Sequence, residues 1–149
     1  RLKVYPMLNV DIKEHNIVIG DDVLLRFMFE NLIDEALRYE SEGEINISVR
    51  RDDSFVRFDF IDKRRNFTQE ELNLLFYPDN AKVTVSDDGN VLSGAEYLVC
   101  KQIIRDHDEF GGRRGCRINA NVADDGIGFC VWFTLPSKND LTRKIMNLD

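Results

Sequence analysis

The sequence has few of the residues on which metal-dependent and covalent enzymes rely. It contains two histidines and three cysteines, and Cys100, Cys116 and Cys130 form no C-x-x-C pair. The spacing typical of a zinc site is missing, as are the G-x-S-x-G and cysteine–histidine patterns of covalent catalysis. An odd number of separated cysteines, with no signal peptide in the sequence, indicates reduced thiols. We therefore expect a cytoplasmic protein.

Basic charge and long apolar runs are also scarce. There are 20 basic against 27 acidic side chains, a formal net charge of −7, which argues against a nucleic acid or an anionic membrane as the main partner. No apolar run approaches the ~20 residues that span a bilayer. The 149 residues, 43% of them hydrophobic, suit a single domain, 1–149, with a full core. Because the chain starts at Arg1, we expect it to be cut from a longer protein.

The first half of the chain has the pattern of a strand, a long helix and a hairpin. Residues 15–20 (HNIVIG) indicate a short strand, and Asp21 or Asp22 suits the N-cap of a helix that Gly43 terminates. The core face of this helix is marked by apolar residues at three- and four-residue spacing: Leu25, Met28, Phe29, Leu32, Ala36 and Tyr39. Apolar residues alternate with polar ones in 45–49 and 55–61, which predicts a hairpin.

In the second half, Thr68 and Glu71 form the capping box of a short helix that Pro78 stops. The polar stretch 79–93 suggests a mobile loop. The remaining segments are a helix at about 94–107, two strands within 116–122 and 128–136 that are joined by the turn Asp124–Gly126, and a weakly amphipathic tail, 137–149. This order predicts an α+β fold: a two-layer α/β sandwich with a mixed, mostly antiparallel sheet and helices on one face.

The helix segment FENLIDEALRYE resembles the N box, N-L-x-x-N-A-x-K-Y, of histidine-kinase ATP-binding domains. These domains belong to the GHKL, or Bergerat, superfamily with DNA gyrase and the heat-shock chaperone ATPases, and the resemblance covers about 15–136. Asn31, Ala36, Arg38 and Tyr39 match in kind, whereas Glu35 replaces the second asparagine. Helical spacing places Asn31, Glu35 and Arg38 on one strip. The resemblance implies that this strip faces a nucleotide, with Asn31 and Glu35 near Mg²⁺; a solvated helix face is the alternative.

A second stretch, FIDKRRNF, lies where the family has its first glycine box, D-x-G-x-G. By this resemblance Asp62 would accept a hydrogen bond from the exocyclic amine of adenine. Glycine lets the backbone turn tightly and approach a base, but Arg64 and Asn66 stand at the two glycine positions. Asparagine tolerates a left-handed conformation and arginine does not. The stretch therefore indicates a remodelled nucleotide site.

The third stretch, SGAEYLVCKQIIRDHDEFGG, resembles the second glycine box, G-x-G-L-A-x-x-K-x-I-V-x-x-H-G-G. Gly94, Lys101 and His107 match, and Glu96 replaces the second glycine. In the family this loop binds phosphates with backbone N–H groups at a helix N-terminus. Glu96 places a negative charge where the phosphates would lie, which is unfavourable. The last strand, GFCVWFTLP, resembles the family's F-x-F-x-L-P ending.

Three other patterns have simpler explanations. ADDGIGF (123–129) spells D-x-G-x-G, but it lies inside the last hairpin and is typical of a turn. His107 followed by Asp108 is faintly similar to a phosphoacceptor site, yet a histidine at a helix C-terminus is also a favourable dipole contact. GGRRGCR (111–117) could cradle an anion, although a solvated basic loop explains it as well.

Two functional hypotheses follow from the resemblance. The first is a histidine-kinase-like domain of a two-component-type protein whose nucleotide pocket has degenerated: a pseudokinase at the C-terminal end of a longer signalling protein. Its partners would be other domains of that protein or a histidine or response-regulator partner. It would make no contact with nucleic acid and none with a membrane by this fragment itself, and a homodimer could form through regions beyond it.

The second hypothesis is an active histidine kinase catalytic domain with a noncanonical Mg-ATP site. ATP and Mg²⁺ would then be the cofactors, Asn31 and Glu35 the metal ligands, and no side chain would act as a covalent catalyst. The residues that the resemblance assigns to nucleotide binding are Asn31, Glu35, Arg38, Tyr39, Asp62, Arg64, Asn66, Gly94 and Lys101. Binding of another small anion in the same cleft is a third possibility.

Overall fold

The computed structural model describes residues 4–11, 18–39, 41–77, 83–85, 91–110 and 115–137. Five strands form one sheet in the order β1-β2-β3-β7-β6. β1 runs parallel to β2, and every other pairing in this sheet is antiparallel. A small second sheet pairs β4 with β5. The strands are β1 (Val4–Asp11), β2 (Gly43–Asp52), β3 (Phe55–Asp62), β4 (Val83–Val85), β5 (Val91–Ser93), β6 (Ile118–Val122) and β7 (Phe129–Pro136).

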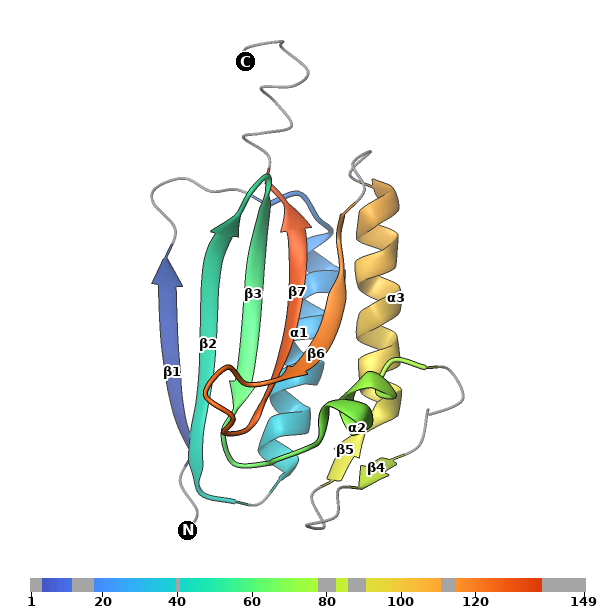
Figure 1. Cartoon of the computed structure of the whole chain (residues 1–149). Coiled ribbons are helices and arrows are strands. Elements are labelled where there is room, and N and C mark those ends of the chain that lie inside the picture. The colour runs from blue at the N-terminus through green and yellow to red at the C-terminus, as the bar shows by residue number, and fades with distance from the viewer. Residues whose placement is uncertain are drawn as a thin grey trace.

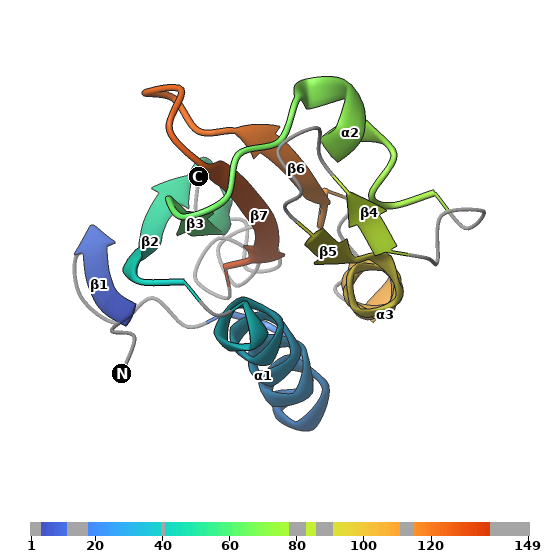
Figure 2. The same cartoon turned by 90° about the horizontal axis from the view of Figure 1, so that it is seen from below.

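The helices are α1 (Asp22–Arg38), α2 (Gln69–Asn73) and α3 (Gly94–Phe110). Figure 1 shows α1 behind the large sheet and α3 beside β6, and the view from below in Figure 2 places both helices on the same face of the sheet. The short α2 contacts β6. This is the expected α+β two-layer sandwich, with a mixed and mostly antiparallel sheet.

Several local predictions are confirmed. Asp21 caps α1 by accepting a hydrogen bond from the Leu24 N–H group. Thr68 and Glu71 form the predicted capping box of α2. Gly126 lies in the turn between β6 and β7, where its N–H group donates to the Ala123 carbonyl. The ADDGIGF stretch is therefore a turn, as its position in the hairpin predicted.

Other predictions need correction or fall outside the described residues. The edge strand β1 was not anticipated. Of the strand predicted at 15–20, Val18 forms only an isolated bridge with Ser137, and residues 15–17 are outside the described part. The stretch predicted as a loop, 79–93, contains β4 and β5. Three further stretches lie outside the described residues: Pro78, most of the GGRRGCR loop (111–114) and the tail beyond residue 137.

The core lies between the two helices and the inner face of the sheet. The N-terminal half of α1 brings Phe29 within 5.5–5.7 Å, centroid to centroid, of Phe58, Phe60 and Phe133. Phe58 and Phe133 stack at 4.9 Å across the β3–β7 pair. These rings bury large apolar areas and position α1 over the sheet.

His107 connects the two helices. It is 1% exposed, its Nδ1 lies 2.7 Å from the Ile103 carbonyl, and its Nε2 accepts a hydrogen bond from the Asp21 N–H group at 2.9 Å. With Nδ1–H donating to Ile103, Nε2 is the acceptor atom. His107 thus ties the end of α3 to the start of α1, a more specific role than the dipole contact expected from the sequence.

Candidate functional site

The residues that resemble the nucleotide boxes meet between the C-terminal half of α1, the end of β3 and the start of α3. Asp62 is the last residue of β3 and is buried. Its Oδ1 accepts hydrogen bonds from the Arg64 backbone N–H group and Nε, at 3.0 and 2.9 Å. Its Oδ2 accepts from Nη2 of Arg64, and from Nε and Nη2 of Arg65, at 2.9–3.0 Å. Five donors from two arginines therefore saturate this carboxylate.

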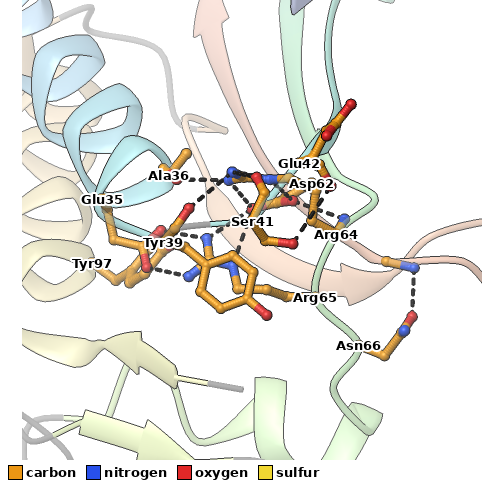
Figure 3. Close-up of polar contacts among 11 residues, drawn as sticks. Glu35, Ala36, Tyr39, Ser41, Glu42, Asp62, Arg64, Arg65, Asn66 and Tyr97 are labelled. Carbon is orange, nitrogen blue, oxygen red and sulfur yellow. Dashed lines mark hydrogen bonds and ion pairs between the residues drawn. The ribbon is translucent and has the colours of Figure 1, made fainter. Parts of the chain in front are cut away.

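The Arg64 side chain is 1% exposed and reaches the C-terminal end of α1. Its Nη2 donates to the Ala36 carbonyl at 2.6 Å, and its Nη1 donates to the carbonyls of Tyr39 and Ser41, each at 3.1 Å. The last carbonyls of a helix have no partner within the helix and carry partial negative charge. Arg64 therefore serves as a side-chain cap for α1 while it pairs with Asp62 (Figure 3).

Arg65 is buried between α1 and the sheet. Its Nη1 and Nη2 donate to the two carboxylate oxygens of Glu35 at 2.6 and 2.8 Å, the fork-to-fork geometry of a strong ion pair. The Tyr97 hydroxyl donates to Glu35 Oε2 at 2.9 Å. The Arg65 guanidinium also lies 5.0 and 5.2 Å from the rings of Tyr39 and Phe129. Figure 3 shows Arg65 held between Glu35 on α1 and Asp62 on β3.

The pKa values of this cluster agree with its hydrogen bonding. Burial alone would lower the pKa of Arg65, but hydrogen bonds to Glu35 and the charges of Glu35 and Asp62 outweigh burial and raise it. Burial and the Glu35 charge raise the pKa of Tyr97 well above its usual value. Arg65 therefore stays charged and Tyr97 stays a hydrogen-bond donor. We call Glu35, Asp62, Arg64, Arg65 and Tyr97 the arginine cluster.

The other helix residues of the predicted site lie around this cluster. The Asn31 side chain donates back to the Phe27 carbonyl of the preceding turn. Arg38 and Glu96 form an ion pair that joins α1 to the first turn of α3. Hydrogen bonding to Glu96 is the main cause that raises the pKa of Arg38. Two of the positions that the family resemblance places near phosphates are thus paired with each other.

The remaining predicted residues are more scattered. Asn66 accepts a hydrogen bond from the Gly128 N–H group through its Oδ1 and so joins the end of β3 to the start of β7. Lys101 Nζ donates to the Phe76 carbonyl, near α2. Gly94 is the first residue of α3. The structure therefore brings together Glu35, Asp62 and Arg64, with Tyr39 beside them. The roles of all nine residues in nucleotide binding stay predictions.

A magnesium ion does not fit the residues as they are arranged. The Glu35 carboxylate accepts three hydrogen bonds from Arg65 and Tyr97, and the Asn31 side chain is held to the Phe27 carbonyl of its own helix through its Nδ2. Among the residues that the structure describes, no group of three or more His, Cys, Asp or Glu side chains could hold a metal ion. An adenine amine would likewise find Asp62 saturated, because acceptor sites on a carboxylate are limited to about four lone pairs.

Sequence reasoning did not assign Arg65 or Tyr97 to the site. Two glycines gave a partial signal. Gly43 has a φ of +149°, and a Cβ there would lie 2.6 Å from Cγ of Arg64. Gly128 has a φ of +83°, and a Cβ there would lie 2.1 Å from the Asp62 carbonyl oxygen. Both glycines make room for the turn that carries the arginines. This role becomes visible only when the pairing of the strands is known.

Comparison with known proteins identifies the family. Residues 20–139 match the model of the histidine kinase-, DNA gyrase B-, and HSP90-like ATPases. The chain is 30% identical over 132 residues to the signal transduction histidine-protein kinase BaeS of Escherichia coli (strain K12); the match covers 86% of this chain and 26% of that protein. The chain therefore spans about a quarter of the length of this relative.

Solved structures show the same fold. A nucleotide-free catalytic domain of histidine kinase ThkA matches with a TM-score of 0.67 at 19% identity, over 93% of this chain and 82% of that one. Full-length ShkA in complex with AMPPNP matches at 0.65 and 17%, over 90% and 26%. ThkA in complex with the response regulator protein TrrA also matches at 0.65 and 17%, over 92% and 35%. With its sequence match over most of its length, the chain belongs to the histidine kinase-, DNA gyrase B-, and HSP90-like ATPase family.

Proposed function

We propose that this domain is the histidine-kinase-type module of a two-component signalling protein, and that its arginine cluster has replaced Mg-ATP. One observation carries the proposal: Arg64 and Arg65 saturate Asp62 with five hydrogen bonds. The residue that would recognise adenine instead holds two arginines of its own chain. Such a pseudokinase acts through contacts with other domains of its protein, or with a histidine or response-regulator partner.

One further observation supports a role in contacts. Glu96 adds a negative charge at the first turn of α3 and pairs with Arg38, so the basic residue of the N box is also engaged.

A cytoplasmic location belongs to the same proposal, because Cys100, Cys116 and Cys130 are free and buried, as is usual in a reducing compartment. Among the described residues, no helix combines the length and the apolar character needed to cross a membrane.

The second candidate is an active histidine kinase domain with a noncanonical Mg-ATP site. It is favoured by the full-length ShkA structure, which has the same fold and contains AMPPNP. In this case Arg64 and Arg65 would have to leave Asp62 when nucleotide binds, and either guanidinium could then stabilise a transferring phosphoryl group. Breaking both buried ion pairs is expensive, and this cost favours the pseudokinase.

Thermal unfolding with and without millimolar Mg-ATP or Mg-ADP tests the proposal. A ligand at about 100 times its Kd adds roughly 2.7 kcal/mol, a rise of several degrees in a chain of this size. We expect no nucleotide-specific rise. Asp62→Asn is the matched variant. A rise in the wild-type protein that Asp62→Asn abolishes would contradict the pseudokinase and support the active kinase.

A further inference from the structure

An apolar cavity lies between the C-terminal half of α1 and the inner face of the sheet. Its volume is about 300 Å³, at the lower end of the range for small-molecule sites. Its walls come from α1, β2, β3 and β7 and include Leu32, Ile33, Leu37, Ile45, Ile47 and Phe60. The family resemblance assigns none of these six residues to nucleotide binding, although Glu35 and Asp62, which it does assign, also line the cavity.

The cavity has a closed end and an open end. Glu35, Asp62, Arg65 and Tyr97 line the closed end, and each of them is at most 5% exposed. Ile33 and Leu37 are 41% and 55% exposed and line the cavity together with Ile45 and Ile47 of β2, so we place the opening on the β2 side. Four of the five residues of the arginine cluster therefore form the floor of a cavity whose mouth is apolar.

Hydrogen bonding at the closed end selects the chemistry of a ligand. Asp62 is saturated by five donors. Glu35 accepts three hydrogen bonds, one fewer than the roughly four that a carboxylate can accept. The Tyr97 oxygen donates its only hydrogen to Glu35 and keeps its lone pairs. The floor thus offers acceptors, and a ligand needs a donor to use them.

The charges of the floor cancel. Glu35 and Asp62 carry two negative charges, which the two positive charges of Arg64 and Arg65 balance through direct ion pairs. A charged ligand would lose its hydration in this cavity without gaining a counter-charge, which is costly. A neutral ligand avoids this cost, and burial of its apolar surface favours binding.

We propose that this cavity binds a small, neutral, mainly apolar molecule with a single N–H or O–H donor. The apolar body would lie between Leu32, Ile47 and Phe60, and the donor would face Glu35 and Tyr97. The site goes beyond the proposed function, because the ligand enters from the β2 side and leaves the ion pairs of the arginine cluster intact. Its test therefore does not depend on whether Mg-ATP binds.

The test uses N-phenyl-1-naphthylamine, a neutral fluorescent probe with one N–H donor, titrated into the intact domain. We expect saturable binding with enhanced, blue-shifted emission. The matched ligand control is 1-anilinonaphthalene-8-sulfonate, which has the same rings and a negative charge. We expect it to bind at least about tenfold more weakly, a difference of 1.4 kcal/mol. Absence of saturable binding by the neutral probe, or equal affinity for the two, would overturn the proposal.

Variants of the domain distinguish binding in the cavity from binding on the surface. Ala36→Leu and Ile47→Phe both add volume at lining positions, so each is expected to weaken binding of the neutral probe by about tenfold or more. Val23→Ser is the control: Val23 is 70% exposed on the same helix and does not line the cavity. Full binding in both lining variants would refute the site, and loss of binding in Val23→Ser would show that the probe adheres to the surface of α1 instead. Thermal unfolding confirms that each variant is folded.

Discussion

The N-terminal and C-terminal halves of α1 rest on the same face of the sheet but contact it through different chemistry. The first half packs Phe29 against Phe58 and Phe133. The second half extends Glu35 to Arg65, which in turn binds Asp62 of β3. Apolar packing depends on volume and shape and tolerates substitution. A buried ion-pair cluster depends on every one of its partners, because removing one leaves an uncompensated charge.

The largest effect is expected from breaking the cluster at its centre. Arg65→Ala removes the counter-charge of the buried Glu35 and two of the five donors to Asp62, and we expect a loss of about 3–5 kcal/mol in the free energy of unfolding. Urea denaturation measures it. If the variant lost less than about 1 kcal/mol, as a surface pair does, the contrast between the two halves of α1 would not hold.

Replacing the Glu35–Arg65 ion pair and the Tyr97 hydroxyl by apolar side chains should not destabilise the protein as Arg65→Ala does. The triple variant Glu35→Leu, Arg65→Met, Tyr97→Phe removes the ion pair and the hydroxyl together, while Arg64 still neutralises Asp62. Replacing a buried pair by apolar side chains of similar volume is neutral or stabilising by about 1–4 kcal/mol. Urea denaturation should therefore place the triple variant well above Arg65→Ala. A triple variant as unstable as Arg65→Ala would mean that packing, not unpaired charge, explains the loss.

The apolar core can be probed by its thiols at alkaline pH. Burial raises the pKa of Cys100 and of Cys116 from 9.0 to about 12. The unfolded chain then releases these protons at lower pH than the folded one. Stability should be constant below about pH 9. It should then fall by up to about 1.4 kcal/mol per pH unit for each thiol as the pH rises toward 12, and level off beyond that.

The urea midpoint between pH 7 and pH 10, measured under reducing conditions, follows this change. Cys100→Ala and Cys116→Ala should each flatten the alkaline slope. A slope that neither substitution alters would mean that other groups, such as Tyr97, cause the loss.

The smallest effect is expected at the surface pair between α1 and α3. The Arg38 side chain is 57% exposed, so solvent screens its attraction to Glu96. Arg38→Ala and Glu96→Ala should each change the free energy of unfolding by at most about 1 kcal/mol. A double-mutant cycle with both substitutions measures the coupling. A coupling as large as the loss expected for Arg65→Ala would mean that Arg38 and Glu96 behave as a buried ion pair, not as a surface pair.

The parts of the fold that local patterns determine could be read from the sequence. Thr68 and Glu71 lie three residues apart and satisfy each other's backbone, so the cap of α2 depends on no distant residue. The edge strand β1 could not be read in the same way. It contains Pro6, which is tolerated at a sheet edge but weakens a strand pattern, and its place is set by pairing with β2.

The site was only partly predictable for a similar reason. Family resemblance located Glu35, Asp62 and Arg64, and the missing glycines indicated a remodelled site. The position of Arg65 depends on Glu35, 30 residues earlier, and the Glu35 carboxylate is held in turn by the Tyr97 hydroxyl. Burying an arginine requires partners from several elements at once, and single-sequence patterns do not register such distant pairs.

Arg64 has a consequence for the motions of α1. Helix ends normally fray, so that their amide hydrogens exchange readily with solvent. Here one guanidinium holds the carbonyls of Ala36, Tyr39 and Ser41 and is itself anchored to the sheet through Asp62. The last turn of α1 therefore opens only together with the end of β3, and the slowest-exchanging amides of the helix should extend to its C-terminal turn.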